Sequence, residues 1–366
     1  MCALLLTGCA QEPAKSPPSA IAIPEPSASP STDTVSTPHS RLGIECADLI
    51  TDAVVAERIP GAIFRTDYFA DMISQSATVP EGLPVLQRGG LVCQWSAVTS
   101  VGSFVGSPQG YTGLKVVVQP DAAADWQRFL DNNDRPESGE WYCFNYREPA
   151  GTFCHLEALV NGSWVSIEIV GIDPESTDND VQLADRVRPF VDGILSIVES
   201  ADVTGPAWSN PLAEPLPSTC EALLPMTQVA AITARTGLVA YDQARAPYPS
   251  ESDGPPRVCD WGYGYESSFG SMTVVPGGAW ALEQTLPAVS PSGAAAAIEI
   301  TGADEDDRAW VRCTIPGQMC VLDLAIGRNW IQLALFGFDS DGNAVSADPA
   351  ATITRLAEGV TANLKT

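Results

Sequence analysis

The chain of 366 residues lacks any apolar stretch long enough to cross a bilayer as a helix, because such a helix needs about 20 consecutive apolar residues. Basic side chains are scarce as well: 19 Lys and Arg stand against 45 Asp and Glu, which gives a formal net charge of −26. A surface this negative repels phosphate backbones. The composition therefore argues against nucleic-acid binding.

Recognisable catalytic motifs are also missing. Of the two histidines, His39 lies in a Pro-rich segment and His155 is expected at the surface of a strand. The sequence has no Gly-x-Ser-x-Gly, His-Glu-x-x-His or phosphate-binding Gly-rich motif. Carboxylates are abundant, so catalysis by an acid/base pair of carboxylates, as in glycoside hydrolysis, remains an alternative. We interpret the acidic run Asp304–Asp307 as a solvated loop, and we expect no cofactor.

What the chain does have is a repeated pattern of cysteine and tryptophan. In the first half the marks are Cys93, Trp95, Cys154 and Trp164, and in the second half they are Cys259, Trp261, Cys320 and Trp330. The step from the first cysteine to the second is the same in both halves, since 154 − 93 equals 320 − 259, and so is the step to the next Trp, since 164 − 154 equals 330 − 320. The pattern predicts two tandem copies of one module.

Each predicted module contains four cysteines, and an even, repeated number in an exported chain is typical of disulfides. Four cysteines allow three pairings, and sequence does not choose among them. We favour local bonds between cysteines close in sequence and longer ones from an opening helix to a strand. Zinc is the alternative, but no Cys-x-x-Cys pair occurs and we expect no metal site. The favoured pairs are Cys143–Cys154 and Cys313–Cys320, with Cys46–Cys93 and Cys220–Cys259.

The N-terminus carries a signal for the cell envelope. Leu6-Thr7-Gly8-Cys9 resembles the lipobox of bacterial lipoproteins, and this resemblance implies cleavage before Cys9 and a lipid attached to it. No basic segment precedes the short apolar run, so we expect a truncated signal, with the start codon placed too far downstream. Stable anchoring needs two or more acyl chains. The anchor would hold the protein on the outer face of the cell membrane.

Composition divides the rest of the chain. Residues 10–43 are rich in Pro, Ser, Thr and Ala and are predicted to form a disordered stalk behind the signal segment 1–9. The first module is predicted over 44–199, a Pro-rich linker over 200–218 and the second module over 219–366. Both modules are acidic: residues 46–200 contain nine basic and 22 acidic side chains, and residues 201–366 contain eight and 19.

The pattern of apolar residues predicts an α+β fold for each module. Residues 156–160, an Asn-Gly turn and residues 164–170 predict a hairpin, whose second strand has one apolar face and one face toward water or a partner. Apolar residues at helical spacing predict helices. They occur near the start of the first module (Leu49, Ile50, Ala53, Val54), in its middle (Ala122, Trp126, Phe129, Leu130) and at both module ends (Ala184, Val187, Val191, Ile194, Val198; Ile353, Leu356, Val360, Leu364). Hairpin-joined strands favour an antiparallel sheet covered by helices.

Several of these sequence motifs together resemble a known family. The lipobox, the Ser/Pro/Thr-rich stalk, the Cys-x-x-Leu-Leu start at Cys220 with its counterpart at Cys46, and the Cys-x-Trp motifs resemble actinobacterial envelope lipoproteins of uncharacterised function. Some such lipoproteins have a fold similar to that of photosystem II subunit P and Mog1, and the expected order of elements suits it. The resemblance implies no catalytic residues.

Three functions are consistent with the sequence. The favoured one is a non-catalytic binding or interaction module whose partner is an envelope protein, a lipid or a glycan. The second is a hydrolase of envelope polymers with paired carboxylates, and the third is a structural spacer. Trp164 and Trp330 are expected either to be buried as structural pins or to line a ligand groove from the less apolar face of their strands.

Overall fold

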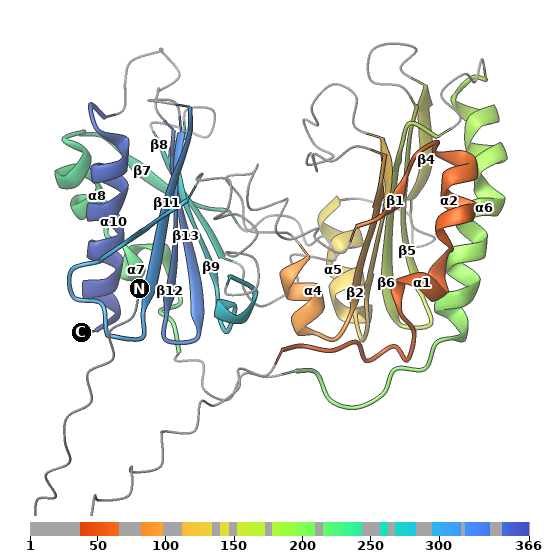
Figure 1. Ribbon diagram of the computed structural model, residues 1–366, viewed down its shortest axis with the longest axis horizontal. Coiled ribbons are helices and arrows are strands. Elements are labelled where there is room, and N and C mark those ends of the chain that lie inside the picture. Colours follow the sequence, from red (N-terminus) through yellow and green to blue (C-terminus); the bar gives the residue numbers. More distant parts are fainter. Residues whose placement is uncertain are drawn as a thin grey trace, which may run out of the picture. The chain divides into compact units, whose positions relative to one another are not determined.

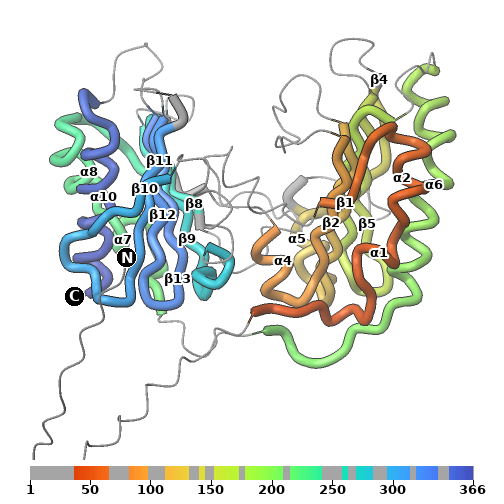
Figure 2. Tube along the Cα trace, viewed as in Figure 1, coloured from red at the N-terminus to blue at the C-terminus, as the bar shows by residue number. Residues whose placement is uncertain are grey.

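The computed structural model describes the greater part of the chain from residue 37 onward (Figure 2). The described ranges are 37–65, 82–97, 112–133, 140–145, 152–172, 178–208, 215–243, 257–262, 268–282, 295–315, 319–336 and 346–365. They lie in the unit Ser36–Thr366 and form an α+β structure with two antiparallel sheets, as the sequence predicts. None of the helices described in these ranges could span a membrane. Cys9 and the predicted stalk up to residue 36 lie outside them.

The first sheet has six strands in the order β1-β2-β3-β6-β5-β4, and every neighbouring pair is antiparallel. The predicted hairpin is β5 and β6, joined by Asn161 and Gly162, which both have positive φ. Asn-Gly suits this turn because both residues tolerate left-handed backbone. The strands are β1 (Ile63–Phe64), β2 (Leu91–Ser96), β3 (Gly113–Gln119), β4 (Glu140–Asn145), β5 (Thr152–Val160) and β6 (Ser163–Val170).

Helices lie on both sides of the first sheet (Figure 1). The long helix α6 (Asp180–Ser200) packs its buried stripe against β4, β5 and β6, on the side where α1 (Cys46–Leu49) and α2 (Asp52–Arg58) also lie. On the other side are α4 (Leu83–Gln87) and α5 (Ala123–Asn133). The main core of this half lies between the sheet and α6.

The second sheet has seven strands in the order β10-β11-β12-β13-β9-β8-β7, again all antiparallel. Its own core lies between the sheet and α10 (Pro349–Leu364), next to α8 (Met226–Thr233) and α7 (Cys220–Leu223). The strands are β7 (Val239–Gln243), β8 (Arg257–Gly262), β9 (Ser268–Val275), β10 (Ala296–Ile298), β11 (Arg308–Ile315), β12 (Met319–Ile326) and β13 (Asn329–Phe336).

Four disulfides join the pairs that the sequence favours. Cys46–Cys93 and Cys220–Cys259 connect the first residue of α1 and of α7 to a strand, across sequence separations of 47 and 39 residues. Cys143–Cys154 and Cys313–Cys320 bridge residues that are directly opposite on paired strands. The longer pair should stabilise by about 4 kcal/mol each and the local pair by about 2.5–3 kcal/mol on the chain-entropy estimate.

Two sequence predictions need correction. The expected opening helix is split into α1 and α2, because Thr51 caps the second helix with its hydroxyl, and it is Val55 rather than Val54 that is buried. The second strand of the hairpin is predicted to leave one face toward water or a partner, and its counterpart in the second half, β13, has the same alternation of residues. In β13, however, Gln332 and Ala334 on that face are as buried as the apolar residues between them.

Candidate functional site

One face of the first sheet carries a row of polar residues that crosses five strands. Alternate residues of a strand point to opposite faces, so the cross-strand pairing decides which side chains are neighbours. The pairing runs Gln94 to Lys115, Lys115 to Glu168, Glu168 to His155, and His155 to Tyr142. This row, together with Glu157, is the polar face of the first sheet, and it points away from the core that α6 covers.

Glu157 is the centre of the polar face and is only 1% exposed. Its carboxylate accepts hydrogen bonds from the indole Nε1 of Trp164 and from the hydroxyl of Ser166, the latter at 2.7 Å. His155 Nε2 lies 3.3 Å from Oε1 of the same carboxylate. Burial of a charge is costly unless donors surround it, and these three side chains supply them.

The second sheet holds an acid at the corresponding point. Asp323 is also 1% exposed, and its Oδ1 accepts hydrogen bonds from Trp330 Nε1 at 3.1 Å and from Gln332 Nε2 at 2.8 Å. Oδ2 lies 3.1 Å from Arg312 Nη1, in an ion pair whose side chains are 3% and 2% exposed. In both halves, then, a buried carboxylate holds the indole of a matched tryptophan.

The tryptophans do not line a groove. Trp164 and Trp330 are both fully buried, in agreement with the alternative that they are structural pins. Helix α5 covers Trp164: the ring centroids of Trp126 and Phe129 lie 5.4 Å and 4.9 Å from its own. Because each indole is covered and its N–H is bonded to the buried acid, neither ring is available to a ligand.

The sequence predicts His155 at the surface of a strand, but this residue is buried. It lies between two carboxylates, those of Glu157 and Glu168. Its Nδ1 is 3.9 Å from Glu168, whose other oxygen is 3.9 Å from Lys115 Nζ. Burial alone would lower the pKa of His155, but the hydrogen bond to Glu157 and the negative charges of Glu157, Glu168 and Glu140 together raise this pKa above its ordinary value of 6.5. The imidazole is therefore held in its charged form to a higher pH than a free one.

The arrangement of Ser166, Glu157 and His155 is not that of a nucleophile and its base. In a catalytic triad the histidine lies between the hydroxyl and the acid, so that it can take the hydroxyl proton. Here the carboxylate lies between them, and both the hydroxyl and the imidazole are directed at it. The cluster therefore stabilises the sheet and does not activate Ser166.

Aromatic side chains continue the polar face toward the edge of the sheet. Tyr142 and Phe144 of β4 have ring centroids 5.0 Å apart, and Phe153 of β5 stacks on His155 at 6.2 Å and 13°. Phe144 is 41% exposed, which makes it one of the few exposed large apolar side chains of the described residues. Counted from the disulfide cysteines, the second sheet has Arg312, Thr314 and Met319 at the positions of Tyr142, Phe144 and Phe153, so this aromatic group is not repeated there.

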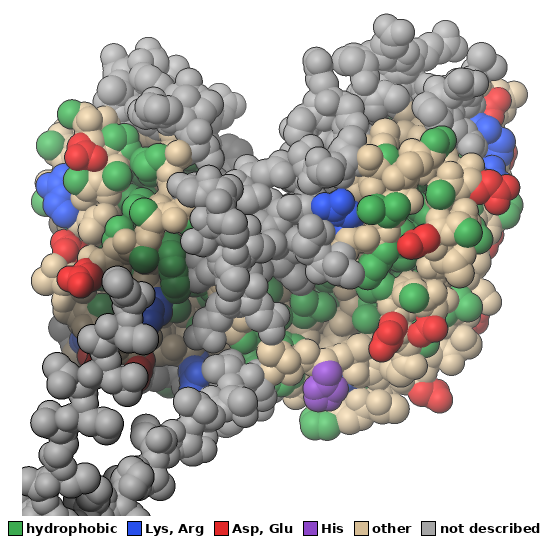
Figure 3. Space-filling model, viewed as in Figure 1, with side chains coloured by type: hydrophobic (Ala, Val, Ile, Leu, Met, Phe, Trp, Pro, Cys, Tyr) green, Lys and Arg blue, Asp and Glu red, His purple; other side chains and the backbone are tan. Residues whose placement is uncertain are grey.

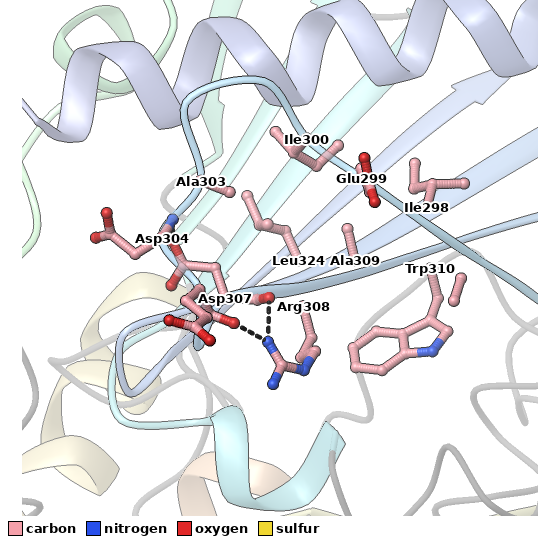
Figure 4. A pocket seen from close by; sticks show the side chains of 12 residues that line it. Ile298, Glu299, Ile300, Ala303, Asp304, Asp307, Arg308, Ala309, Trp310 and Leu324 are labelled. Carbon is pink, nitrogen blue, oxygen red and sulfur yellow. Dashed lines mark hydrogen bonds between the residues drawn. The ribbon is translucent and has the colours of Figure 1, made fainter.

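A pocket of about 430 Å³ lies beside β10 and β11 of the second sheet (Figure 4). Its apolar lining includes Ile300, Leu324 and Trp310, and carboxylates lie at the end formed by the turn after β10. In that turn Asp307 accepts hydrogen bonds from backbone N–H groups, and Arg308 donates to carbonyl oxygens of the same turn. The charged groups of the pocket thus largely stabilise the turn, which agrees with its interpretation as a loop.

Acidic side chains are otherwise dispersed. Figure 3 shows Asp and Glu scattered among apolar and uncharged side chains on the side in view. The described residues contain no group of three or more His, Cys, Asp or Glu side chains that could hold a metal ion.

No family model matches the chain, and no curated protein matches it. A solved structure, DynU16 from the dynemicin biosynthetic locus, aligns with 83% of this chain and 96% of its own at 15% identity, with a TM-score of 0.12. A TM-score this low carries no argument about fold or function.

Proposed function

We propose that the chain is a lipid-anchored lipoprotein of the bacterial cell envelope, similar to the uncharacterised actinobacterial lipoproteins. The lipobox supports the anchor at Cys9, and the four disulfides support an oxidising compartment, because disulfides are rare in the cytosol. The acidic surface is repelled by anionic lipid headgroups, which favours modules held off the membrane by the stalk.

The two halves are, in this proposal, tandem copies of one module. Their strand orders correspond, β1-β2-β3-β6-β5-β4 with β7-β8-β9-β13-β12-β11, and their disulfides and buried acids occupy corresponding places. The order of helices and strands also suits a fold similar to that of photosystem II subunit P and Mog1. A duplicated module favours binding, since repeated modules add area or avidity.

The role that we propose is binding of an envelope partner rather than catalysis. The observation that carries it is the aromatic group of Tyr142, Phe144 and Phe153, which ends in an exposed ring and which the second sheet does not share. Exposed aromatic side chains are enriched at recognition surfaces because they bury a large area at little entropic cost. The buried acids Glu157 and Asp323, by contrast, are occupied by structural contacts.

Binding of the intact chain to purified envelope fractions tests this role. The chain would be exported with Cys9→Ser, so that it stays soluble, and sedimented with the fractions in the variants Phe144→Ser and Val54→Ser. Val54 is a matched control because it is 43% exposed but lies on α2. We expect Phe144→Ser to lose at least tenfold in affinity and Val54→Ser to bind like the parent. Equal binding of all three would refute the role of the aromatic group.

An assay for substrate turnover distinguishes the hydrolase alternative from the binding proposal. The same protein, incubated with a panel of envelope glycans and peptides, should release no product. Product formation that disappears on one Asp or Glu substitution, with the four disulfides intact, would replace the binding proposal with the hydrolase.

A further inference from the structure

One disulfide of the second half is accessible from solvent. The structure describes all eight cysteines of the four bonds, and among them Cys313 is the exposed residue. Its partner Cys320 is 2% exposed and belongs to the core of the second half. Access to one sulfur is sufficient for exchange, because a thiolate attacks a single sulfur atom of the bond. Cys313 therefore makes this disulfide the one that a thiol from solvent reaches first.

The first half contains a bond of the same kind that is covered. Cys143–Cys154 also joins directly opposite residues of two paired strands, and its Cα–Cα distance of 4.0 Å compares with 4.1 Å for Cys313–Cys320. Cys143 and Cys154, however, are 3% and 0% exposed. Because the two bonds differ in access and not in backbone spacing, Cys143–Cys154 is a matched control.

The covering helices account for this difference in access. Helix α6 packs chiefly against β4, the strand of Cys143, whereas α10 packs chiefly against β12 and less against β11, the strand of Cys313. The buried stripe of α6 begins at Leu183, which belongs to the same core as Cys143. The matched position of the second half is Pro349, since 349 − 183 equals 330 − 164, and this first residue of α10 is only half-buried. The buried stripe therefore starts one turn later in α10.

The strand pairing beside Cys313 is also less regular. The register of β11 against β12 shifts between Cys313 and Ile315, whereas β4 pairs with β5 without a shift from Cys143 to Asn145. Such a shift weakens the local ladder. The bond also spans the smallest sequence separation of the four, seven residues, so on the loop-entropy argument it stabilises the fold least. The remaining pairs of β11 and β12 hold the sheet together when the bond opens.

From these observations we propose that Cys313–Cys320 is an exchangeable disulfide, at which a small monothiol reacts with the sulfur of Cys313. The thiolate attacks Cys313 Sγ and forms a new S–S bond to it, while the bond to Cys320 breaks and its electron pair leaves on Cys320 Sγ, which takes up a proton. A second thiolate then attacks the bound thiol and releases Cys313, so that two thiols are oxidised to one disulfide and the protein bond is reduced. This modification site goes beyond the proposed binding role and does not depend on it.

Opening of the bond by unfolding is the competing explanation, and the second half contains its control. Cys220–Cys259 lies in the same half, and its residues are 5% and 0% exposed. Unfolding of the second half would expose both of its disulfides together. Direct attack on the folded protein opens Cys313–Cys320 alone.

The test compares the rates at which the four disulfides open in the full chain carrying Cys2→Ser and Cys9→Ser, which retains the eight framework cysteines. The folded protein is incubated with glutathione in mildly alkaline buffer, quenched at intervals with excess iodoacetamide and mapped without reductant. We expect Cys313–Cys320 to open at least tenfold faster than Cys143–Cys154 and Cys220–Cys259, with glutathione attached to Cys313. A rate equal to that of either control bond, or glutathione attached mainly to Cys320, would overturn the proposal.

A variant of the first half tests the role of the covering helix. Leu183→Ala removes the side chain with which the buried stripe of α6 begins, so Cys143–Cys154 should open at least threefold faster relative to Cys46–Cys93, the other bond of that half. Cys313–Cys320 should keep its rate. An unchanged ratio of the two rates would refute the account of helix cover. If Leu183→Ala does not fold, the rates in the parent chain decide the proposal.

Discussion

The buried ion pair of the second sheet makes a quantitative prediction. The side chains of Asp323 and Arg312 are 2% and 3% exposed, and Asp323 also accepts hydrogen bonds from Trp330 and Gln332. Asp323→Asn keeps the shape and one acceptor oxygen but removes the charge, which leaves the guanidinium of Arg312 buried without its counterion. Loss of one partner of a buried pair costs about 3–5 kcal/mol.

A double variant tests whether the loss of stability comes from the unpaired charge or from disruption of the packing. In Arg312→Met with Asp323→Asn, both charges are gone and the amide oxygen still accepts from Trp330 and Gln332. Apolar replacement of buried pairs is often close to neutral, so we expect the double variant within about 1 kcal/mol of the parent. The two single losses should therefore be strongly non-additive.

Urea unfolding read by hydrogen exchange is the suitable assay, because it resolves the two sheets in one chain. With an m-value of about 2 kcal/mol/M, Asp323→Asn should lower the midpoint for residues 319–336 by about 2 M. Peptides from residues 152–170 in the first sheet serve as the internal control and should not shift. A loss below about 1 kcal/mol, or a double variant that is no better than the single ones, would refute the description of this pair as buried and coupled.

Three further predictions follow from the same contacts. Because the folded-state pKa of His155 is raised above 6.5, its stabilising effect is fully present below that pH and is lost as pH rises through the folded pKa; the urea midpoint of the first sheet should fall over that range in the parent and not in His155→Val. Trp164→Phe should cost about 2–4 kcal/mol, because it removes a donor from a buried carboxylate and shrinks a packed ring, and an unchanged midpoint would contradict this. Replacing the pair Cys220–Cys259 by serine should cost about 4 kcal/mol against about 2.5 kcal/mol for Cys313–Cys320, as measured by equilibrium unfolding, and equal losses would contradict the loop-length argument.

Much of the fold was predictable because it depends on local patterns. The helical spacing at the end of each half predicts α6 and α10, and the Asn161-Gly162 turn predicts the β5–β6 hairpin. The split of the opening helix was not predictable from spacing, since apolar residues at helical spacing continue on both sides of Thr51. Only the N-cap that the Thr51 side chain forms shows that a new helix, α2, begins there.

The candidate site was harder to predict from the sequence than the fold. Glu157 and Asp323 were indistinguishable from the other carboxylates until the pairing of strands placed them beside Trp164 and Trp330. A signal did exist, because the two acids are separated by the same interval as the two matched tryptophans: 323 − 157 equals 330 − 164. The strand order could not be foreseen, since it is set by contacts between segments far apart in the sequence.

The most direct test of the central proposal is the intact mass of the protein, purified without reductant from the membranes of its own bacterium. We predict a chain that begins at Cys9, carries two or more acyl chains on that residue and contains four disulfides. A chain found in the cytosol, unacylated at Cys9 and with free thiols at the eight framework cysteines, would contradict the account of an anchored envelope lipoprotein.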